Sequence, residues 1–543
     1  MSDLPPPPPG SPGGPEYLDS AGGGPLRPPS GPPAEGGRRR TLIGVGAVAV
    51  LALVGGGAWA AWSFFATGPQ PAEALPDTTL AYASIDLDPS GGQKIEALRT
   101  LRKFPAFKDK IGLDTDDDVR QRIFEEIQKS GACEDVDYGD DIEPWLGDRM
   151  AVAAVDTGDE TPVPVFVVQV SDGDKADAGL QRLRDCGDSD SGAWAINDGW
   201  ALVGESQDAV DQIAADAAEA PLSDDDDYAT WTDEAGDAGI ATFYAAPEAG
   251  AALADNLDRM AAPLEGLGEG DESSTSSDLV PSPARETLKD FHGMAATVRF
   301  DDGALEVEVA ADMGKSQEAL VSEGGDDVLA TLPEDTAAAI GVGFSEGWFG
   351  DLVDQMATSF DTGMSSEELL SQLSEESGLD LPGDAETLAG DSAAVAVGSD
   401  FDPETFYNSE DGSGVPVGVK VKGDPDAIDG VLDKLRPQLG GSESVLESDS
   451  DGDMIAIGPD ADYRSRLLED GDLGGSDVYR NVVRESDKAA AVLFVNFDAG
   501  DWLTKTADEE PEATENLEPL EGLGISGWRD GDTSHAVLRI TTD

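Results

Sequence analysis

The chain has 543 residues and a formal net charge of −78, from 34 Lys and Arg against 112 Asp and Glu. A surface this negative repels phosphate backbones and anionic lipid head groups, which excludes nucleic-acid binding and disfavours docking on acidic membranes. The charge belongs entirely to residues 71–543, because residues 1–40 sum to zero and residues 41–70 carry no charged side chain.

The chain begins with a low-complexity segment. Residues 1–37 contain 12 Pro and 9 Gly. Such a segment buries too little apolar surface to offset the entropy lost on ordering, so we expect a disordered, partly polyproline arm over residues 1–40.

An apolar stretch without charge follows, from Leu42 to Ala66. As a helix these residues would measure about 37 Å, enough to cross a hydrocarbon core of about 30 Å. Three arginines at 38–40 precede the stretch, and Glu73 and Asp77 follow it, so the positive-inside rule places the N-terminus in the cytoplasm. We predict a single-pass signal anchor at 41–67. A cleaved twin-arginine export signal is the alternative, although secretory apolar regions are usually shorter, about 7–15 residues.

The stretch DTDDDVRQRIFE, residues 114–125, is a candidate calcium loop. Its carboxylates occupy the ligand positions of such a loop: Asp114, Asp116, Asp118 and Glu125. However, Val119 stands where the loop requires Gly, and the apolar spacing that follows predicts a helix with acidic residues in its first turn. A second acidic cluster, DSDGD, predicts a hairpin turn first and a cation site second through Asp449, Asp451 and Asp453.

The chain contains two cysteines, Cys133 and Cys186. Outside the cytoplasm such a pair predicts a disulfide, and two buried free thiols are the alternative.

One line of the sequence occurs twice. VPVFVVQVSDGDKADAGLQRLR at 163–184 matches VPVGVKVKGDPDAIDGVLDKLR at 415–436 at ten of 22 positions. Each copy predicts a strand of period two and then an amphipathic helix, in which Leu180 matches Leu432. Further matches join LPDTT at 75 with LPEDT at 332, and Tyr228 with Tyr479. We therefore predict two homologous tandem repeats, 68–319 and 320–543.

The links between predicted strands are short. This predicts an α+β fold with largely antiparallel sheets flanked by helices. The two copies could form separate beads or a pseudo-twofold pair that shares one sheet.

The stretch GFSEG, residues 343–347, fits the nucleophile elbow of α/β hydrolases, with Ser345 as nucleophile and His535 as a later histidine. We expect a strand-to-helix turn instead, because the first copy lacks the motif and the elbow requires a parallel sheet. The stretch GLGISG at 522–527 precedes a hairpin where a dinucleotide site needs a helix, so we expect no cofactor. Two His and no Cys/His cluster argue against a transition metal.

The order of the LPDTT strand, LRKFPAF, WLGDRMAVAAVD and VPVFVVQV resembles membrane-anchored actinobacterial proteins grouped as domain-of-unknown-function family 3352. The resemblance covers most of residues 75–543. It implies this layout and a location in the cell envelope, and it implies no catalytic residues.

These features predict a membrane-anchored extracytoplasmic protein that is not an enzyme. We expect a binding or structural module of the cell envelope, whose partner is an envelope protein or polymer. The alternatives are an envelope hydrolase that uses Ser345 and a calcium-responsive surface module.

Overall fold

The computed structural model describes residues 69–87, 92–105, 118–129, 133, 135–159, 161–186, 192–261, 288–314, 320–359, 364–409, 411–440, 443–469, 471–500, 502–503 and 515–543. The predicted arm at 1–40 and the predicted membrane segment at 41–67 lie outside these residues. Among the residues described, no helix is long and apolar enough to cross a membrane.

Within the described residues, the N-terminal half contains eight strands and the helices between them. The strands are β1 (Thr79–Asp86), β2 (Leu146–Val155), β3 (Val163–Val170), β4 (Ala193–Asn197), β5 (Trp200–Gly204), β6 (Ala241–Ala245), β7 (Gly293–Asp301) and β8 (Ala304–Asp312). The helices are η2 (Pro71–Ala74), α2 (Gly92–Leu101), α4 (Val119–Lys129), η3 (Tyr138–Ile142), α5 (Gly173–Cys186), α6 (Gln207–Glu219), η4 (Leu222–Asp224), α7 (Asp226–Glu234) and α8 (Pro247–Ala261).

The C-terminal half has the same number of strands. They are β9 (Thr336–Gly343), β10 (Ser392–Gly398), β11 (Val417–Lys422), β12 (Ser448–Asp451), β13 (Met454–Ile457), β14 (Ala491–Asn496), β15 (Leu520–Asp530) and β16 (Thr533–Thr542). The helices are α10 (Gly325–Leu329), α11 (Trp348–Ser359), α12 (Ser366–Ser377), α13 (Gly383–Ala389), α14 (Pro403–Asn408), α15 (Pro425–Leu435), η7 (Arg436–Leu439), η8 (Glu443–Leu446), α16 (Ala461–Leu468), η9 (Leu473–Gly475) and α17 (Asp477–Val482).

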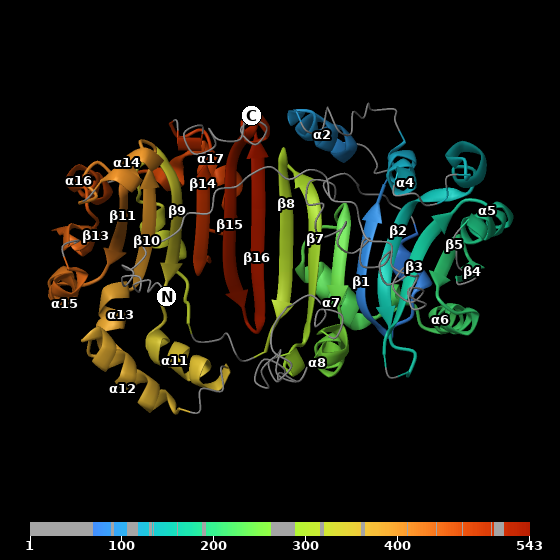
Figure 1. The fold of residues 1–543 in the computed structure, drawn as a ribbon, viewed down its shortest axis with the longest axis horizontal. Helices are drawn as coiled ribbons and strands as arrows, with labels where there is room; N and C mark the ends of the chain where they lie inside the picture. Colours follow the sequence, from blue (N-terminus) through green and yellow to red (C-terminus); the bar gives the residue numbers. More distant parts are fainter. Residues whose placement is uncertain are drawn as a thin grey trace, which may run out of the picture. The chain divides into compact units, whose positions relative to one another are not determined.

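All these strands form one sheet of 16 strands, in the order β12-β13-β11-β10-β9-β14-β15-β16-β8-β7-β6-β1-β2-β3-β5-β4 (Figure 1). Every paired strand in it runs antiparallel to its neighbour. The prediction of a largely antiparallel sheet with helices is therefore confirmed. The two halves share this sheet, because β8 of the first half pairs with β16 of the second.

The strand order inward from each edge is the same in both halves, with the fourth and fifth strands at the edge and the eighth strand at the centre. Local contacts match as well. The Thr79 hydroxyl donates to the Pro76 carbonyl at 2.7 Å, and Thr336 donates to Pro333 at 2.7 Å. These bonds fix the turn before the first strand of each half.

One face of the sheet, which we call the packed face, carries Ala337, Ala339 and Gly341 of β9. Helices α10, α16 and α17 cover it in the second half, and α6 and α7 cover it in the first. Small residues let the helices come close. A Cβ at Gly341 would lie 2.2 Å from the carbonyl oxygen of Gly325 in α10, so that position has no room for a side chain.

The predicted alignment of the repeated line is wrong by one residue within its strand. It matched Val165 with Val417, but Val165 lies in the core of the packed face, whereas Val417 lies on the same side as Val419, on the opposite face. A slip of one residue moves every side chain of a strand to the other face. Lys420 consequently points into the packed face, where it is 3% exposed and its Nζ donates to the Thr331 hydroxyl at 2.8 Å.

Candidate functional site

The other face of the sheet, which we call the open face, carries Ala338, Ile340 and Val342 of β9. Side chains of a strand alternate between faces, so each strand presents every second residue here. From β13 to β4, each strand contributes an apolar side chain to one continuous row: Ile457, Val419, Val395, Ile340, Leu493, Ile525, Leu538, Val307, Val298, Ala241, Ile85, Met150, Val168, Ala201 and Ile196.

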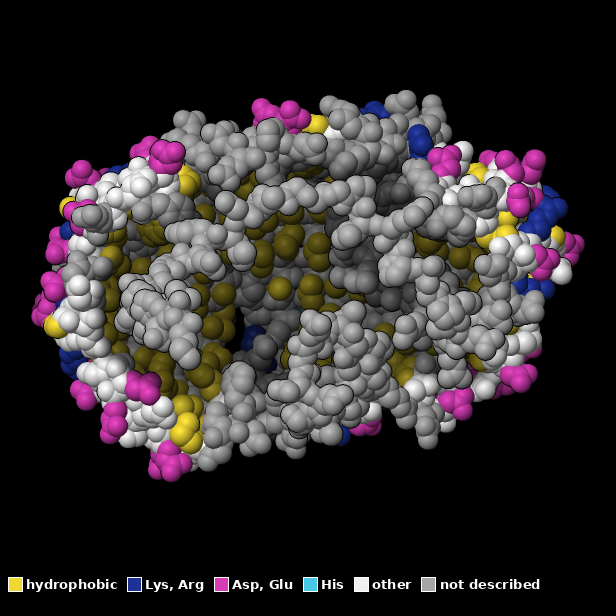
Figure 2. All heavy atoms as spheres, in the orientation of Figure 1, with side chains coloured by type: hydrophobic (Ala, Val, Ile, Leu, Met, Phe, Trp, Pro, Cys, Tyr) yellow, Lys and Arg dark blue, Asp and Glu magenta, His cyan; other side chains and the backbone are white. Residues whose placement is uncertain are grey.

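The neighbouring rows are also apolar over the central strands. On one side run Val417, Val397, Ala338, Val495, Leu523, Ile540, Leu305 and Phe300. On the other side run Val421, Ala393, Val342, Ala491, Gly527, Ala536, Val309 and Ala296. Figure 2 shows hydrophobic side chains gathered in a hollow of this face, with Asp and Glu at its rim.

Among the described residues, several helices pack on parts of the open face. Helix α15 covers β11 and β13 with Ile428 and Leu432, and α5 covers the opposite edge with Ala176 and Leu180. Helix α2 packs on β6 and β7.

Between these helices, the row from Val395 to Leu538 belongs to none of the core clusters of the described residues. Ile340 is 49% exposed and its cross-strand partner Val395 is 46% exposed. Contiguous apolar surface of this kind marks a binding site in soluble domains more often than chance exposure does.

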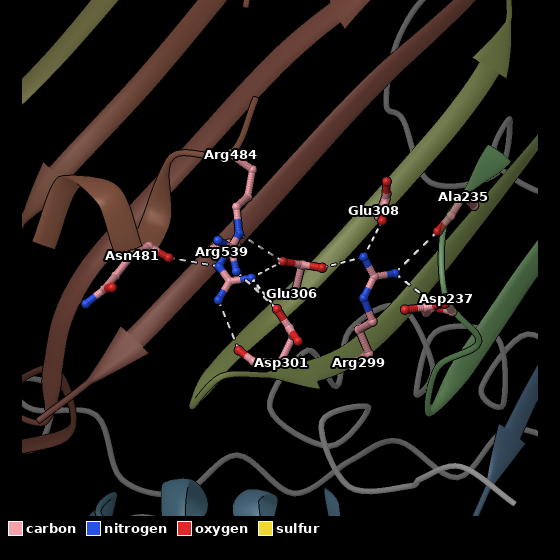
Figure 3. A network of polar contacts seen from close by, with 9 residues as sticks. All are labelled: Ala235, Asp237, Arg299, Asp301, Glu306, Glu308, Asn481, Arg484 and Arg539. Carbon is pink, nitrogen blue, oxygen red and sulfur yellow. Dashed lines mark hydrogen bonds and ion pairs between the residues drawn. The ribbon is translucent and has the colours of Figure 1, made fainter. Parts of the chain in front are cut away.

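Where the two halves meet, the packed face carries charged side chains. Arg539 of β16 stands opposite Glu306 of β8, which in turn stands opposite Arg299 of β7. Figure 3 shows Glu306 between the two arginines, with Arg299 also reaching Glu308. Arg539 is 1% exposed and Glu306 is 3% exposed, so this chain of charges is buried.

Residues from both halves complete this network. The Nε of Arg539 donates to the Asn481 carbonyl at 2.9 Å, and its Nη1 donates to Asp301 at 3.0 Å. Burial alone would raise the pKa of Asp301, but the hydrogen bond and charge of Arg539, with the charge of Arg484, hold that pKa below its usual value. These paired, largely buried charges join the two halves of the sheet.

Ser345 lines a cleft of about 880 Å³ at the end of β9. The cleft brings Ser345 together with Asp453, a predicted cation ligand, and with further carboxylates and two aromatic residues: Glu346, Glu386, Asp391, Asp424, Phe344 and Trp348. It also contains Lys422, which pairs with Asp327 at 3.2 Å. The predicted turn at Ser345 is present, since β9 ends at Gly343 and α11 begins at Trp348.

The structure does not bring Ser345 to a histidine. His535 stacks on Trp528 and lies in β16, three strands from β9, or about 14 Å at about 4.8 Å per strand. His292 pairs with Asp312 at 3.0 Å beside β7, which is farther still from β9. A serine nucleophile needs its base within about 2.6–3.2 Å, so neither histidine can activate Ser345 in this arrangement.

A smaller polar cavity of about 240 Å³ lies where β1 and β6 meet α7. Asp86 and Arg149 line it and form a buried ion pair at 2.9 Å. Burial raises the pKa of nearby Tyr228 to about 12, so its hydroxyl stays protonated.

The predicted calcium loop is only partly described, because Asp114 and Asp116 lie outside the described residues. Asp118 precedes α4, where it accepts from the Arg120 guanidinium at 2.8 Å and from the Tyr138 hydroxyl at 2.6 Å. Burial alone would raise the pKa of Asp118, but these bonds hold it below its usual value. Glu125 pairs with Arg122 at 3.1 Å. Asp118 and Glu125 are therefore both paired with side chains of helix α4 or of its neighbour η3.

The second acidic cluster forms the predicted hairpin. Asp451 of β12 pairs across the turn with Met454 of β13, and Asp449 accepts from Arg464 at 2.8 Å. No group of three or more potential ligands that could hold a metal ion occurs within the described part of the chain. The three aspartates do not converge: Asp449 is paired, Asp451 lies in the strand and Asp453 faces the cleft.

Cys133 and Cys186 form a disulfide, with their Cα atoms 5.1 Å apart. The bridge joins the segment before η3 to the end of α5 and packs with Leu183 and Trp194 in one hydrophobic cluster. It therefore holds in place the helix that covers one edge of the open face.

Sequence reasoning did not find the open face or the buried charge network. The sequence did contain a sign of the open face. In the strand at 163–170, the residues that point to each of the two faces of the sheet are mostly apolar. The network had no such signal, since Arg539 and Glu306 are 233 residues apart.

Comparison with known proteins identifies a family match over part of the chain. Residues 43–193 match the model of a family described as "Protein of unknown function (DUF3352)". No curated protein matches the chain. A solved structure entitled "Structure of crystal form III of TP0453" is 8% identical, covers 46% of this chain and 82% of its own, and has a TM-score of 0.21. A likeness at that level carries no argument about fold or function.

Proposed function

We propose that this protein is a non-catalytic binding module of the cell envelope that holds an apolar partner on the open face of its sheet. One observation carries the proposal. Ile340 and Val395 stand opposite each other on adjacent strands, each nearly half exposed, in the middle of rows of apolar side chains. Burying such side chains against a partner contributes roughly 25 cal/mol for each Å² removed from water.

We further propose that the module is anchored by the charge-free segment at 42–66, with its N-terminus in the cytoplasm and its acidic domain outside. The arginines at 38–40 and the absence of charge up to residue 70 support this topology. The family match at 43–193 and the resemblance of the later motifs favour membership of family DUF3352 for the whole chain. Protease added to intact cells without an outer membrane should remove the acidic domain and leave a short membrane stub.

The two halves are, on this proposal, copies of one ancestral unit. The identical strand orders and the matched Thr79 and Thr336 hydrogen bonds support a duplication. Because β8 pairs with β16, the apolar rows of the open face continue from the second half into the first.

A photo-crosslinking side chain at Ile340 tests the binding role in native membranes. We expect adducts from position 340 and none from position 445, because Val445 is exposed to a similar extent, 47%, but lies in η8 outside the rows of the open face. Equal labelling from both positions would show that the open face has no special partner.

A further inference from the structure

We infer that the partner of the open face is the acyl chain of a membrane lipid. This inference rests on the proposed function and names the chemistry of its ligand. The central rows of the face contain only apolar residues and glycine over β10, β9, β14, β15 and β16. The backbone polar groups of these strands are occupied in the ladders between them. The surface can therefore recognise hydrocarbon, and it offers nothing to a sugar polymer or a charged head group.

The size of the surface fits one acyl chain. Five strands at about 4.8 Å spacing span about 19 Å, and three rows along the strands span about 13 Å. One leaflet of a hydrocarbon core of about 30 Å is about 15 Å deep. A chain of leaflet length therefore lies across the strands between α15 and α2 without leaving the apolar rows.

The short link between the apolar stretch and the sheet supplies the second argument. Pro69 is held to the sheet, because its carbonyl accepts a hydrogen bond from Arg149, which is paired with the buried Asp86. The apolar stretch ends at Ala66, so two residues, 67 and 68, separate it from Pro69. Because an extended chain covers at most about 3.6 Å per residue, Pro69 is held within about 11 Å of the end of that segment. An anchored domain on so short a tether meets lipid before any other apolar partner.

Charge determines how lipid is taken up. The domain carries the whole net charge of −78, which opposes flat docking on a bilayer with anionic lipids. The acidic rim in Figure 2 would meet the head groups first. Uptake of single lipid molecules into the hollow avoids this repulsion, so the open face acts as a lipid-holding surface next to the membrane and not as a surface that lies on it.

Photolabelling of the full chain tests the inference. The protein is reconstituted in phosphatidylcholine vesicles that contain a trace of phosphatidylcholine with a diazirine on its acyl chain, irradiated, digested and mapped by mass spectrometry. We expect adducts on peptides of β9, β10 and β14. Ile340→Asp and Val395→Asp should each lower that yield at least about fivefold, because a carboxylate in the row must be desolvated by hydrocarbon.

The matched control is Val445→Asp, which introduces the same charge at a similarly exposed apolar residue outside the face and should leave the yield unchanged. Circular dichroism melting of the three variants separates loss of binding from loss of folding, and Ile340→Ser provides a milder change at the same site. An equal loss of label in Val445→Asp, or no label on the face, would overturn the inference.

A second crosslinker distinguishes the inference from the proposed function. Ile340→Cys is coupled to a bifunctional reagent in the same vesicles and in native membranes. If the face carries no lipid adduct but crosslinks to a second copy or another protein, lipid is wrong and the binding role stands. If it gives neither kind of adduct, or crosslinks to residues 42–66 of its own chain, both proposals fail.

Discussion

Arg539 of β16 stands directly opposite Glu306 of β8, and this buried ion pair lies where the two halves of the sheet meet. The Glu308–Val537 pair lies in the middle of this pairing. Two residues along β16 on one side of it Arg539 meets Glu306, and two residues along on the other side His535 meets Ala310, where no such ion pair forms. The ion pair therefore makes the junction of β8 and β16, which we call the seam, unequal on its two sides. A shift of β16 against β8 would leave both charges buried without a partner, so the pair selects one register.

Removing one member of the pair should destabilise the fold strongly. We expect Arg539→Met to lower the free energy of unfolding by about 3–5 kcal/mol, because Glu306 and Asp301 lose their shared buried partner. Urea denaturation of the full chain in nanodiscs measures this change.

The control for this prediction is Arg480→Met, which removes an exposed pair with Asp477 whose side chains are 58% and 90% exposed. It should change the free energy of unfolding by less than about 1 kcal/mol. Similar effects from both variants would mean that the seam pair has no special role.

The helices over the two ends of the open face should be equally sensitive. Leu180 of α5 is 8% exposed and Leu432 of α15 is 2% exposed, and each packs on the open face of its own half. Leu180→Ala and Leu432→Ala should each lower the free energy of unfolding by about 2–5 kcal/mol. A neutral result at either position would break the equivalence of the two helices. Leu439→Ala, at a residue 40% exposed, provides the control and should have little effect.

Local patterns in the sequence predicted the local structure well. The alternation of Val and Lys at 417–422 predicted β11, and the spacing of Ile428 and Leu432 predicted α15, which Asp424 caps. The hairpin at DSDGD and the helix start after Asp118 are both present. These features depend on residues close in sequence, where turn chemistry and periodicity determine the outcome.

The features that depend on distant residues could not be predicted in this way. Sequence identity aligned Val165 with Val417, but the two valines point to opposite faces of the sheet. The register of a strand depends on what each face packs against. Lys420 stands on the side of the predicted strand that alternates with its valines, yet it is buried, because Thr331 in the turn after α10 accepts its hydrogen bond. The open face was missed because a strand that is apolar on both sides predicts a sheet with helices on both faces. On part of this sheet's open face, no described helix joins the apolar side chains in a core cluster.

Acidification should weaken the seam through Asp301. Its pKa is lowered in the folded state, so its contribution to stability is present above the unfolded value, about 3.9, and is lost as the pH falls through the lower folded value. Asp301→Asn should be less stable than the parent at neutral pH, and the difference should shrink as the pH falls below about 4. Urea midpoints from pH 7 down to pH 3 measure this.

Asp326 provides a control of opposite sign. Burial raises its pKa, although the Tyr479 hydroxyl donates to it, so its contribution is full below the unfolded value and is lost as the pH rises through the folded value. Asp326→Asn should therefore retain or gain stability at pH 7 relative to the parent. Parallel behaviour of the two variants would contradict the assignment of either shift.

Loss of the disulfide should destabilise the edge of the open face. Cys133 and Cys186 are 53 residues apart, and in the chain-entropy model a loop of that length contributes about 4 kcal/mol. The double variant Cys133→Ala and Cys186→Ala should melt at a lower temperature than the parent and lose protection from hydrogen exchange in α5 first. Mass spectrometry of the non-reduced chain checks the bridge directly, and two freely alkylated thiols would mean that it does not form.

Salt should stabilise the acidic domain. Residues 71–543 hold 30 basic and 108 acidic side chains, so like-charge repulsion opposes compaction. Salt at about 0.1 M screens exposed charges beyond about 10 Å, so we expect the melting temperature to rise between low and physiological NaCl.

Calcium distinguishes screening from specific binding. At fixed ionic strength we expect millimolar Ca²⁺ to add little, because Asp118 is already paired with Arg120, Asp449 is paired with Arg464, and Asp453 faces a different space. A specific site would add a stabilisation of RT ln(1 + [L]/Kd) beyond screening, and Mg²⁺ would add less because it dehydrates reluctantly. Melting in matched CaCl₂, MgCl₂ and NaCl measures the difference. A large shift with Ca²⁺ alone that Asp116→Ala or Asp451→Ala abolishes would show that one of the acidic clusters is a true cation site, and the calcium-responsive role would then replace the one proposed above.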